Sequence, residues 1–151
     1  MQEQEENLQT LLDLQQNELN ALDAVADSID SRNLAILGAN LTLLVYIAQT
    51  GFGLAVWQYA VIFAPFLASA AFNLWLIRPS QYYGNTDLSV HPEYLSLSRR
   101  DLLLQLISNT QFALDNNARL NRTRIRLCMA ALLLAVIGVI FLFVTIKVWV
   151  K

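Results

Sequence analysis

A stretch of 45 residues without a charged side chain, from Asn33 to Ile77, constrains this chain more than any other feature of its sequence. The hydrocarbon core of a bilayer is ~30 Å thick and is crossed by ~20 helical residues, so the stretch is too long for one membrane span and suffices for two. The sequence TGFG at residues 50–53 contains two glycines, which favour a tight turn. The pattern therefore predicts two transmembrane helices within residues 33–77, near Leu34–Gln49 and Leu54–Ile77.

A second uncharged segment, Leu127–Ile146, contains no proline and is long enough for one more span. The composition agrees with this interpretation, because 56% of the residues are hydrophobic and only 15% are charged. Soluble domains average about 45–50% apolar and about 25% charged residues. These observations predict a third transmembrane helix and place the chain among membrane proteins.

Residues 1–32 are predicted to form an amphipathic helix that precedes the first span. Its apolar residues recur at spacings of three and four, with acids and glutamines between them. This Leu8–Ile29 stripe consists of Leu8, Leu11, Leu12, Leu19, Leu22, Val25 and Ile29. Gln15 interrupts the heptad spacing, which favours a short coiled coil over a long one. We expect the stripe to pack on a helix of the same chain, on a second subunit or on a cytoplasmic partner protein.

Residues 78–98 contain two prolines, a glycine and other turn formers, which predicts a loop. Ser98 and Asp101 then form a capping box, and no further proline or glycine occurs before Gly138. We therefore predict one long helix within residues 99–151, polar in its first half and membrane-spanning in its second. The expected fold class is all-α: an integral membrane protein with three transmembrane helices and a small cytoplasmic helical stalk, built from the N-terminal helix and the polar half of the last helix.

The distribution of basic residues predicts the orientation in the membrane. Three spans put the two termini on opposite sides, and eight of the ten Lys and Arg residues then share the side of the N-terminus. The positive-inside rule counts these residues and largely ignores acids. We expect a multi-pass protein of the cell inner membrane, with the N-terminus and the loop at 78–98 in the cytoplasm and the C-terminus outside.

Three arginines before the third span are the candidate phosphate or lipid-headgroup residues. Arg119, Arg122 and Arg126 share one helical face because they are spaced by three and four residues, whereas Arg124 points away from that face. One interpretation is that they extend to lipid headgroups and fix the depth of the span. The other is that they bind a phosphate-bearing ligand or an anionic lipid, which would make the protein a lipid-binding organiser.

Uncharged polar residues and small residues are the other candidates within the spans. Asn40, Gln49 and Asn73 are expected either to hydrogen-bond between helices or to line a polar pathway in an oligomer. Alanines four residues apart allow helices to approach closely, and they favour a homo-oligomer. The candidate packing residues are Ala60, Ala64, Ala68, Ala131 and Ala135.

No arrangement of residues indicates catalysis. The single histidine, His91, has no cysteine or second histidine near it with which to hold a metal. The sequence also lacks a nucleophile motif, a phosphate-binding loop and a dinucleotide fingerprint. We therefore expect no enzymatic activity, no cofactor, no metal and no nucleic-acid partner.

The order of the segments resembles the small prokaryotic transmembrane effectors of nucleotide-signalled phage defence, the Pycsar-type and CBASS-associated groups. The resemblance covers roughly residues 20–148. It is carried by ALDAVADSIDSRNLAILGANLTLL, by the loop sequence HPEYLSLS and by LLLQLISNTQFALDNNARLNRTRIRLCMAALLL. It implies an oligomer that impairs the inner membrane when a partner signals infection. Because this chain lacks an appended cyclic-nucleotide-binding domain, direct binding of a cyclic nucleotide is left open.

Two functions follow from these features. The first is an oligomeric inner-membrane effector that forms a pore or otherwise perturbs the membrane in phage defence. The alternative is a non-conducting scaffold or regulatory subunit that docks a cytoplasmic partner through the Leu8–Ile29 stripe.

Overall fold

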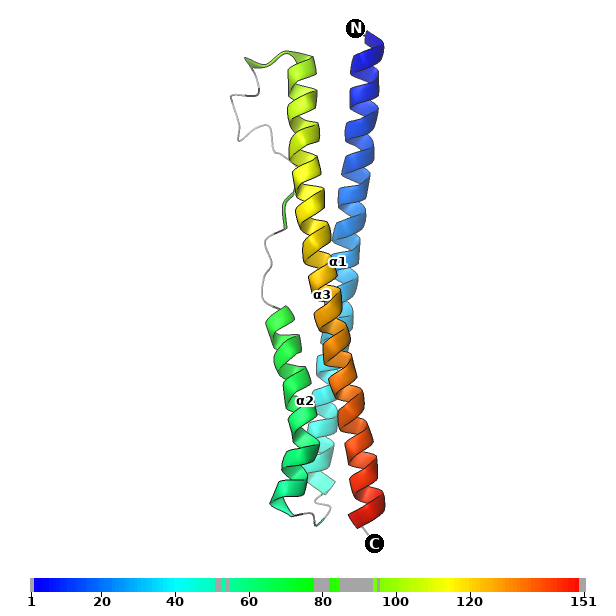
Figure 1. The fold of residues 1–151 in the computed structure, drawn as a ribbon, viewed down its shortest axis with the longest axis vertical. Helices are drawn as coiled ribbons and strands as arrows, with labels where there is room; N and C mark the ends of the chain where they lie inside the picture. Colours follow the sequence, from blue (N-terminus) through cyan, green and yellow to red (C-terminus); the bar gives the residue numbers. More distant parts are fainter. Residues whose placement is uncertain are drawn as a thin grey trace. The chain divides into compact units, whose positions relative to one another are not determined.

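A computed structural model of the chain describes residues 2–50, 53, 55–77, 82–84, 94 and 96–149. Within these ranges the fold is built from three helices and contains no strand: α1 (Gln2–Thr50), α2 (Val56–Leu76) and α3 (Arg99–Trp149) (Figure 1). Each helix is long and apolar enough to cross a membrane. The all-α class and the three candidate spans expected from the sequence are therefore confirmed.

The helix boundaries follow local sequence signals. The Ser98 Oγ accepts a hydrogen bond from the Asp101 backbone N–H at 3.2 Å and donates one to the Asp101 Oδ2 at 2.7 Å, which caps the N-terminus of α3. The long final helix, expected from about Arg99, spans 51 residues. The amphipathic helix and the first span form one continuous helix of 49 residues, because no glycine or proline separates them.

The connections are described only in part. Gly53, between α1 and α2, has a φ of 64°, a left-handed conformation that glycine adopts readily. The rest of the glycine turn expected at residues 50–53 lies mostly outside the described residues, as do most of the loop at 78–98 and His91.

The chain divides into two compact units. The first unit comprises Met1–Asp27 and Ser80–Arg122, and the second comprises Ser28–Pro79 and Thr123–Lys151. In the first unit α1 and α3 run parallel. Glu5 pairs with Arg99 at 3.6 Å, the Gln15 Nε2 donates to the Gln111 Oε1 at 2.9 Å, and the Asn121 Nδ2 donates to the Leu22 backbone oxygen at 2.8 Å.

Buried residues recur at every seventh position along both long helices. They are Leu12, Leu19, Ala26, Asn33, Asn40 and Ile47 on α1, and Leu103, Thr110, Asn117, Arg124, Ala131 and Gly138 on α3. A heptad period is the spacing of coiled-coil packing. Gln15 is itself buried and hydrogen-bonded to α3, so it takes part in the buried stripe, contrary to the expectation that it would interrupt it.

In the second unit α2 runs antiparallel to the other two helices. The core cluster that includes Ile47, Ile62, Phe66 and Leu142 draws on all three helices. A second cluster, formed by Ile29, Leu76 and Cys128, lies nearer the opposite end of α2. Between these two apolar clusters lie four buried polar residues of the second unit: Asn33, Asn40, Ser69 and Asn73.

Candidate functional site: a polar chain in the three-helix unit

A serine hydroxyl on α2 joins all three helices of the second unit. The Ser69 Oγ donates a hydrogen bond to the Ala131 backbone oxygen on α3 at 2.6 Å and accepts one from the Asn40 Nδ2 on α1 at 2.7 Å. The Asn73 Nδ2 lies 3.5 Å from the same oxygen. Because a hydroxyl has one proton and two lone pairs, these three contacts use its full hydrogen-bonding capacity. Asn40, Ser69 and Asn73 are each 1% exposed or less.

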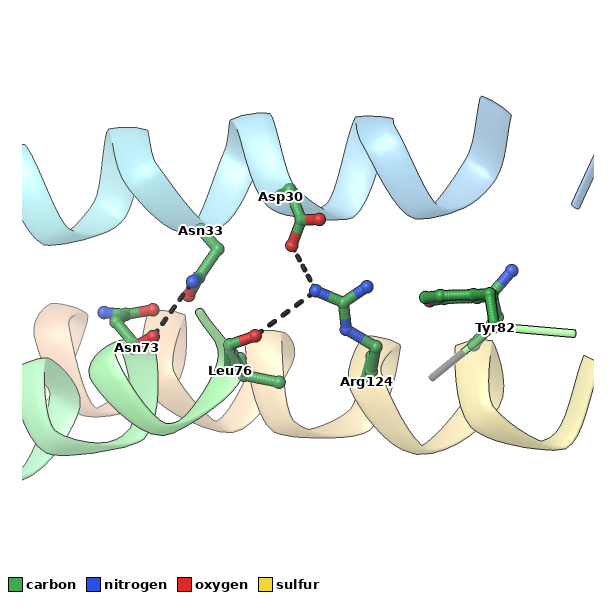
Figure 2. Close-up of polar contacts among 7 residues, drawn as sticks. Asp30, Asn33, Asn73, Leu76, Tyr82 and Arg124 are labelled. Carbon is green, nitrogen blue, oxygen red and sulfur yellow. Dashed lines mark hydrogen bonds and ion pairs between the residues drawn. The ribbon is translucent and has the colours of Figure 1, made fainter. Parts of the chain in front are cut away.

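A second asparagine of α1 extends this polar chain. The Asn33 Nδ2 donates to the Asn73 backbone oxygen at 3.0 Å (Figure 2). Asn33 and Asn40 face the core together because they are seven residues apart on α1. The structure thus brings Asn40 and Asn73, two of the candidates taken from the sequence, into one hydrogen-bonded group between helices. Asn33 and Ser69 are the members of that group that the sequence analysis did not single out.

The asparagines donate hydrogen bonds but leave acceptors unused. The Oδ1 atoms of Asn33, Asn40 and Asn73 are buried and have no hydrogen-bond partner. A buried polar group without a partner costs about 1–3 kcal/mol. The second unit therefore holds three uncompensated amide oxygens inside candidate membrane spans, and any rearrangement that supplied donors to them would recover part of that cost.

An ion pair closes the polar chain at the end of the unit where α2 terminates. Arg124 on α3 contacts the Asp30 carboxylate on α1, and its second contact is with the Leu76 backbone oxygen at 3.3 Å (Figure 2). Leu76 is the last residue of α2, so its carbonyl lacks an intrahelical partner and carries part of the negative end of the helix dipole. The Arg124 side chain is only 7% exposed, whereas that of Asp30 is 48% exposed.

The arginines favoured by the sequence analysis lie elsewhere. Arg119, Arg122 and Arg126 are exposed. The first two belong to the first unit and Arg126 belongs to the second. Arg124, which was set apart from them because it points away, is the arginine that the structure buries and uses.

Gln49 does not join the asparagines. It is exposed near the end of α1, where it lines a shallow hollow of about 470 Å³ with other residues of the same helix.

The alanine candidates differ in how deeply they are buried. Ala60 and Ala64 are exposed on α2, while Ala68 and Ala135 are half-buried. Ala131 is fully buried, and its carbonyl accepts the Ser69 hydrogen bond. Small residues thus serve close packing within the second unit at Ala131, whereas the first two alanines of α2 lie on its surface.

In the first unit, two further asparagines of α3 hold the segment at residues 82–84. The Asn117 amide makes a reciprocal pair with the Tyr83 backbone, donating to the carbonyl at 2.9 Å and accepting from the N–H at 3.0 Å. The Asn121 Oδ1 accepts a hydrogen bond from the Tyr82 hydroxyl at 2.7 Å. The Tyr83 ring also packs edge-on against Phe112, with the ring centroids 5.2 Å apart.

The Leu8–Ile29 stripe is used mostly within the chain. Leu12, Leu19 and Ile29 are buried, and Leu19 packs on Ala113 and Leu114 of α3. Leu8 and Leu22 are half-buried. Leu11 and Val25 remain exposed at 44% and 41%, and the neighbouring Leu14 is exposed at 58%.

Comparison with models of protein families, with curated proteins and with solved structures finds no match to this chain. Among the residues that the structure describes, no group of three or more His, Cys, Asp or Glu side chains is placed to hold a metal ion.

Proposed function

We propose that this protein is an oligomeric effector of the inner membrane that perturbs the membrane by exposing the polar chain of its second unit. The observation that carries the proposal is the set of three buried amide oxygens without partners, at Asn33, Asn40 and Asn73. Polar side chains within spans are costly to keep and commonly mark a path for water or ions. In this proposal the described arrangement is the closed state, because the asparagines face the core of their own chain.

The hydrogen bonds of the polar chain contribute little to the cost of opening. Interhelical hydrogen bonds in membranes contribute about 0.6 kcal/mol each on average. Separating the helices breaks the Asn33–Asn73 and Asn40–Ser69 bonds and the Ser69–Ala131 bond. These three hydrogen bonds therefore add only roughly 2 kcal/mol to the cost of separating the helices, beside the packing of the apolar clusters. The freed oxygens would then face water in an oligomer.

The proposal includes the orientation and role that the sequence suggested. The N-terminus lies in the cytoplasm, the C-terminus lies outside, and the first unit forms the cytoplasmic stalk. The resemblance to transmembrane effectors of nucleotide-signalled phage defence supports a role in that process. A signal from a partner would then act on the first unit and trigger the rearrangement of the second.

Ion or dye flux from liposomes that contain the purified full chain tests this function, with and without candidate cyclic nucleotides. We expect flux from the wild-type protein and a strong loss in Asn40→Leu, because the variant removes an amide from the path while keeping the branched shape and the number of side-chain heavy atoms. Thr42→Val is the matched control, since Thr42 is exposed and its hydroxyl donates a hydrogen bond to the Gly38 carbonyl of its own helix. Unchanged flux in Asn40→Leu would refute the role of the polar chain.

The alternative function is a non-conducting scaffold or regulatory subunit that docks a cytoplasmic protein. The exposed Leu11, Leu14 and Val25 of the first unit favour it, because they are apolar side chains of α1 that the described part of the chain leaves exposed. Liposomes that stay tight under every condition, combined with loss of a co-purifying partner in Leu11→Glu/Leu14→Glu, would select this function over the effector. Neither function requires enzymatic activity.

A further inference from the structure

Two adjoining grooves follow the seam between α1 and α3 in the second unit. One has a volume of about 330 Å³ and the other of about 430 Å³. They share Ala35 and Ile36 of α1 and Leu132 of α3, so they form a continuous channel along the seam. We call this channel the α1–α3 groove.

Small side chains form part of the lining of the groove. Ala35 and Ala39 on α1 and Ala135 on α3 line it together with larger apolar side chains. Asn40 also lines the groove, although its side chain is only 1% exposed and its Oδ1 has no partner. The groove is thus an apolar channel with one buried amide among its lining residues.

One end of the groove carries a positive charge. Arg32 lines it there together with Ile29 and Cys128. Arg32 is exposed and makes no ion pair with any residue in the described part of the chain. This is also the end of the second unit at which charged residues resume after the apolar segments, with Arg126 exposed on α3. A guanidinium group at the mouth of an apolar channel is complementary to an anionic amphiphile.

The length of the groove matches one leaflet of a bilayer. From Arg32 to Leu43 α1 rises about 16 Å at 1.5 Å per residue. Half of a hydrocarbon core of ~30 Å is about 15 Å. An acyl chain whose phosphate group lies beside Arg32 would therefore reach the Leu43 end of the groove near the bilayer midplane.

The charge at one end of the groove favours a lipid over a helix of a second copy. A phospholipid carries an anionic phosphate at the end of its hydrocarbon chains, which matches Arg32 at one end and the apolar lining along the rest. Residues 56–77 and 127–146 of a second copy would offer apolar helices but no anionic side chain for Arg32.

We propose that the α1–α3 groove binds one acyl chain of an anionic phospholipid, with the phosphate group on Arg32. The site depends on the three helices lying in a bilayer, but it does not depend on conduction. If the protein sits with its N-terminus in the cytoplasm, the site opens to the cytoplasmic leaflet, which is the leaflet rich in anionic lipids.

Photo-crosslinking in nanodiscs tests the site. The full chain is reconstituted in phosphatidylcholine with a minor fraction of phosphatidylglycerol that carries a diazirine on one acyl chain, and the adducts are mapped by peptide mass spectrometry. We expect adducts concentrated on the α1 segment from Ala35 to Leu43 and the α3 segment from Leu132 to Ile140. Ala39→Leu fills the groove and should lower these adducts several-fold. Ala64→Leu adds the same volume at an exposed alanine of α2 outside the groove and should leave them unchanged.

A second variant tests the headgroup contact separately from the fold. Arg32→Gln should lower the preference for phosphatidylglycerol over a phosphatidylcholine probe of the same design by roughly fivefold, the contribution of one basic residue near a membrane surface. Adducts spread evenly over the exposed side chains of all three helices would overturn the proposal, and so would groove adducts that are insensitive to both Ala39→Leu and Arg32→Gln. If the wild-type protein gives no flux in the liposome assay but shows the expected adducts, the result contradicts the effector function and supports the lipid site.

Discussion

Arg124 carries a positive charge that is almost entirely buried, and its position decides how the end of the second unit is held together. It joins three helices, through the Asp30 carboxylate on α1, the terminal carbonyl of α2 and its own backbone on α3. The two members of the ion pair are not equivalent, because Asp30 is half-exposed and Arg124 is not. Water can solvate the carboxylate if the arginine is removed, but it cannot reach the guanidinium group equally well.

This asymmetry predicts the order of stability among variants. Asp30→Ala leaves a buried charge without its counter-charge and should lower the free energy of unfolding by up to about 3 kcal/mol. Arg124→Met removes the charge, keeps an unbranched side chain as far as the position of Nε and should cost less. The double variant should be more stable than Asp30→Ala alone, because it no longer buries an unpaired charge. Unfolding of the purified protein in mixed detergent micelles, followed by circular dichroism, measures all three.

Equal losses in Asp30→Ala and Arg124→Met would show that the pair behaves as an exposed ion pair. Arg126→Met serves as the control for loss of an arginine from α3, since Arg126 is exposed. It should have little effect on stability.

At the scale of the element, two helical glycines differ in how closely their neighbours pack. Comparing them distinguishes the effect of packing on stability from the effect of helix propensity. A Cβ added to Gly138 on α3 would lie 2.9 Å from the ring of Phe66, which is fully buried in the core of the second unit. A Cβ added to Gly38 on α1 would meet nothing within 4 Å. Both glycines lie inside helices, so the change in intrinsic helix propensity is the same at both positions.

Gly138→Ala should therefore destabilise the protein by about 1–3 kcal/mol, because the new methyl group forces the buried Phe66 ring to shift. Gly38→Ala should stabilise it by about 0.5–1 kcal/mol, because alanine has the higher helix propensity. The same detergent-unfolding measurement compares the two variants directly. Stabilisation by both substitutions would mean that α2 and α3 do not approach each other at Gly138.

The sequence predicts the elements well where one strong signal acts locally. The capping box at Ser98 and the absence of glycine and proline up to Gly138 fixed the start and length of α3. The heptad pattern was harder to recognise, because polar residues occupy several of its buried positions. On α1 they are Asn33, Asn40 and also Gln15, which lies three residues after Leu12 and four before Leu19; on α3 they are Thr110, Asn117 and Arg124. Reading the period without regard to polarity would have placed Gln15 in the stripe and Arg124 in the core, since both hold the heptad spacing of their helices.

The periodicity of the sequence predicts which residues are buried, but it does not predict which residues of the other helices they contact. The spacing of Arg124 marks it as buried, but only the tertiary arrangement shows that Asp30 and the end of α2 lie beside it. In the same way, Ser69 carries no sequence signal of its own, because its role depends on a carbonyl of α3 and an amide of α1. Contacts between residues about 29 to 94 positions apart are set by packing, which a local pattern does not encode.

For the whole molecule, the position of α1 relative to the membrane decides the topology. Its uncharged segment is short for a span, because the 18 residues from Asn33 to Thr50 rise only about 27 Å. The 21 residues from Asp30 to Thr50 rise about 32 Å, which suffices for the ~30 Å hydrocarbon core. The ion pair with Arg124 partly neutralises Asp30, so this carboxylate can lie at the boundary of the membrane at a lower cost than an unpaired charge.

If α1 crosses the membrane, the N-terminal half of α1 and the end of α3 lie on opposite sides. Single cysteines at Asn17 and Lys147, both exposed, test this with a membrane-impermeant maleimide on intact cells. Both are introduced with Cys128→Ala, although the native Cys128 is buried and should itself label poorly. We expect labelling of Lys147→Cys on intact cells and of Asn17→Cys only after the membrane is permeabilised. Labelling of both on intact cells, or of neither, would mean that α1 does not cross. The polar chain of the second unit would then face an interface between membrane and water instead of a bilayer core, and its asparagines would need no pore to find partners.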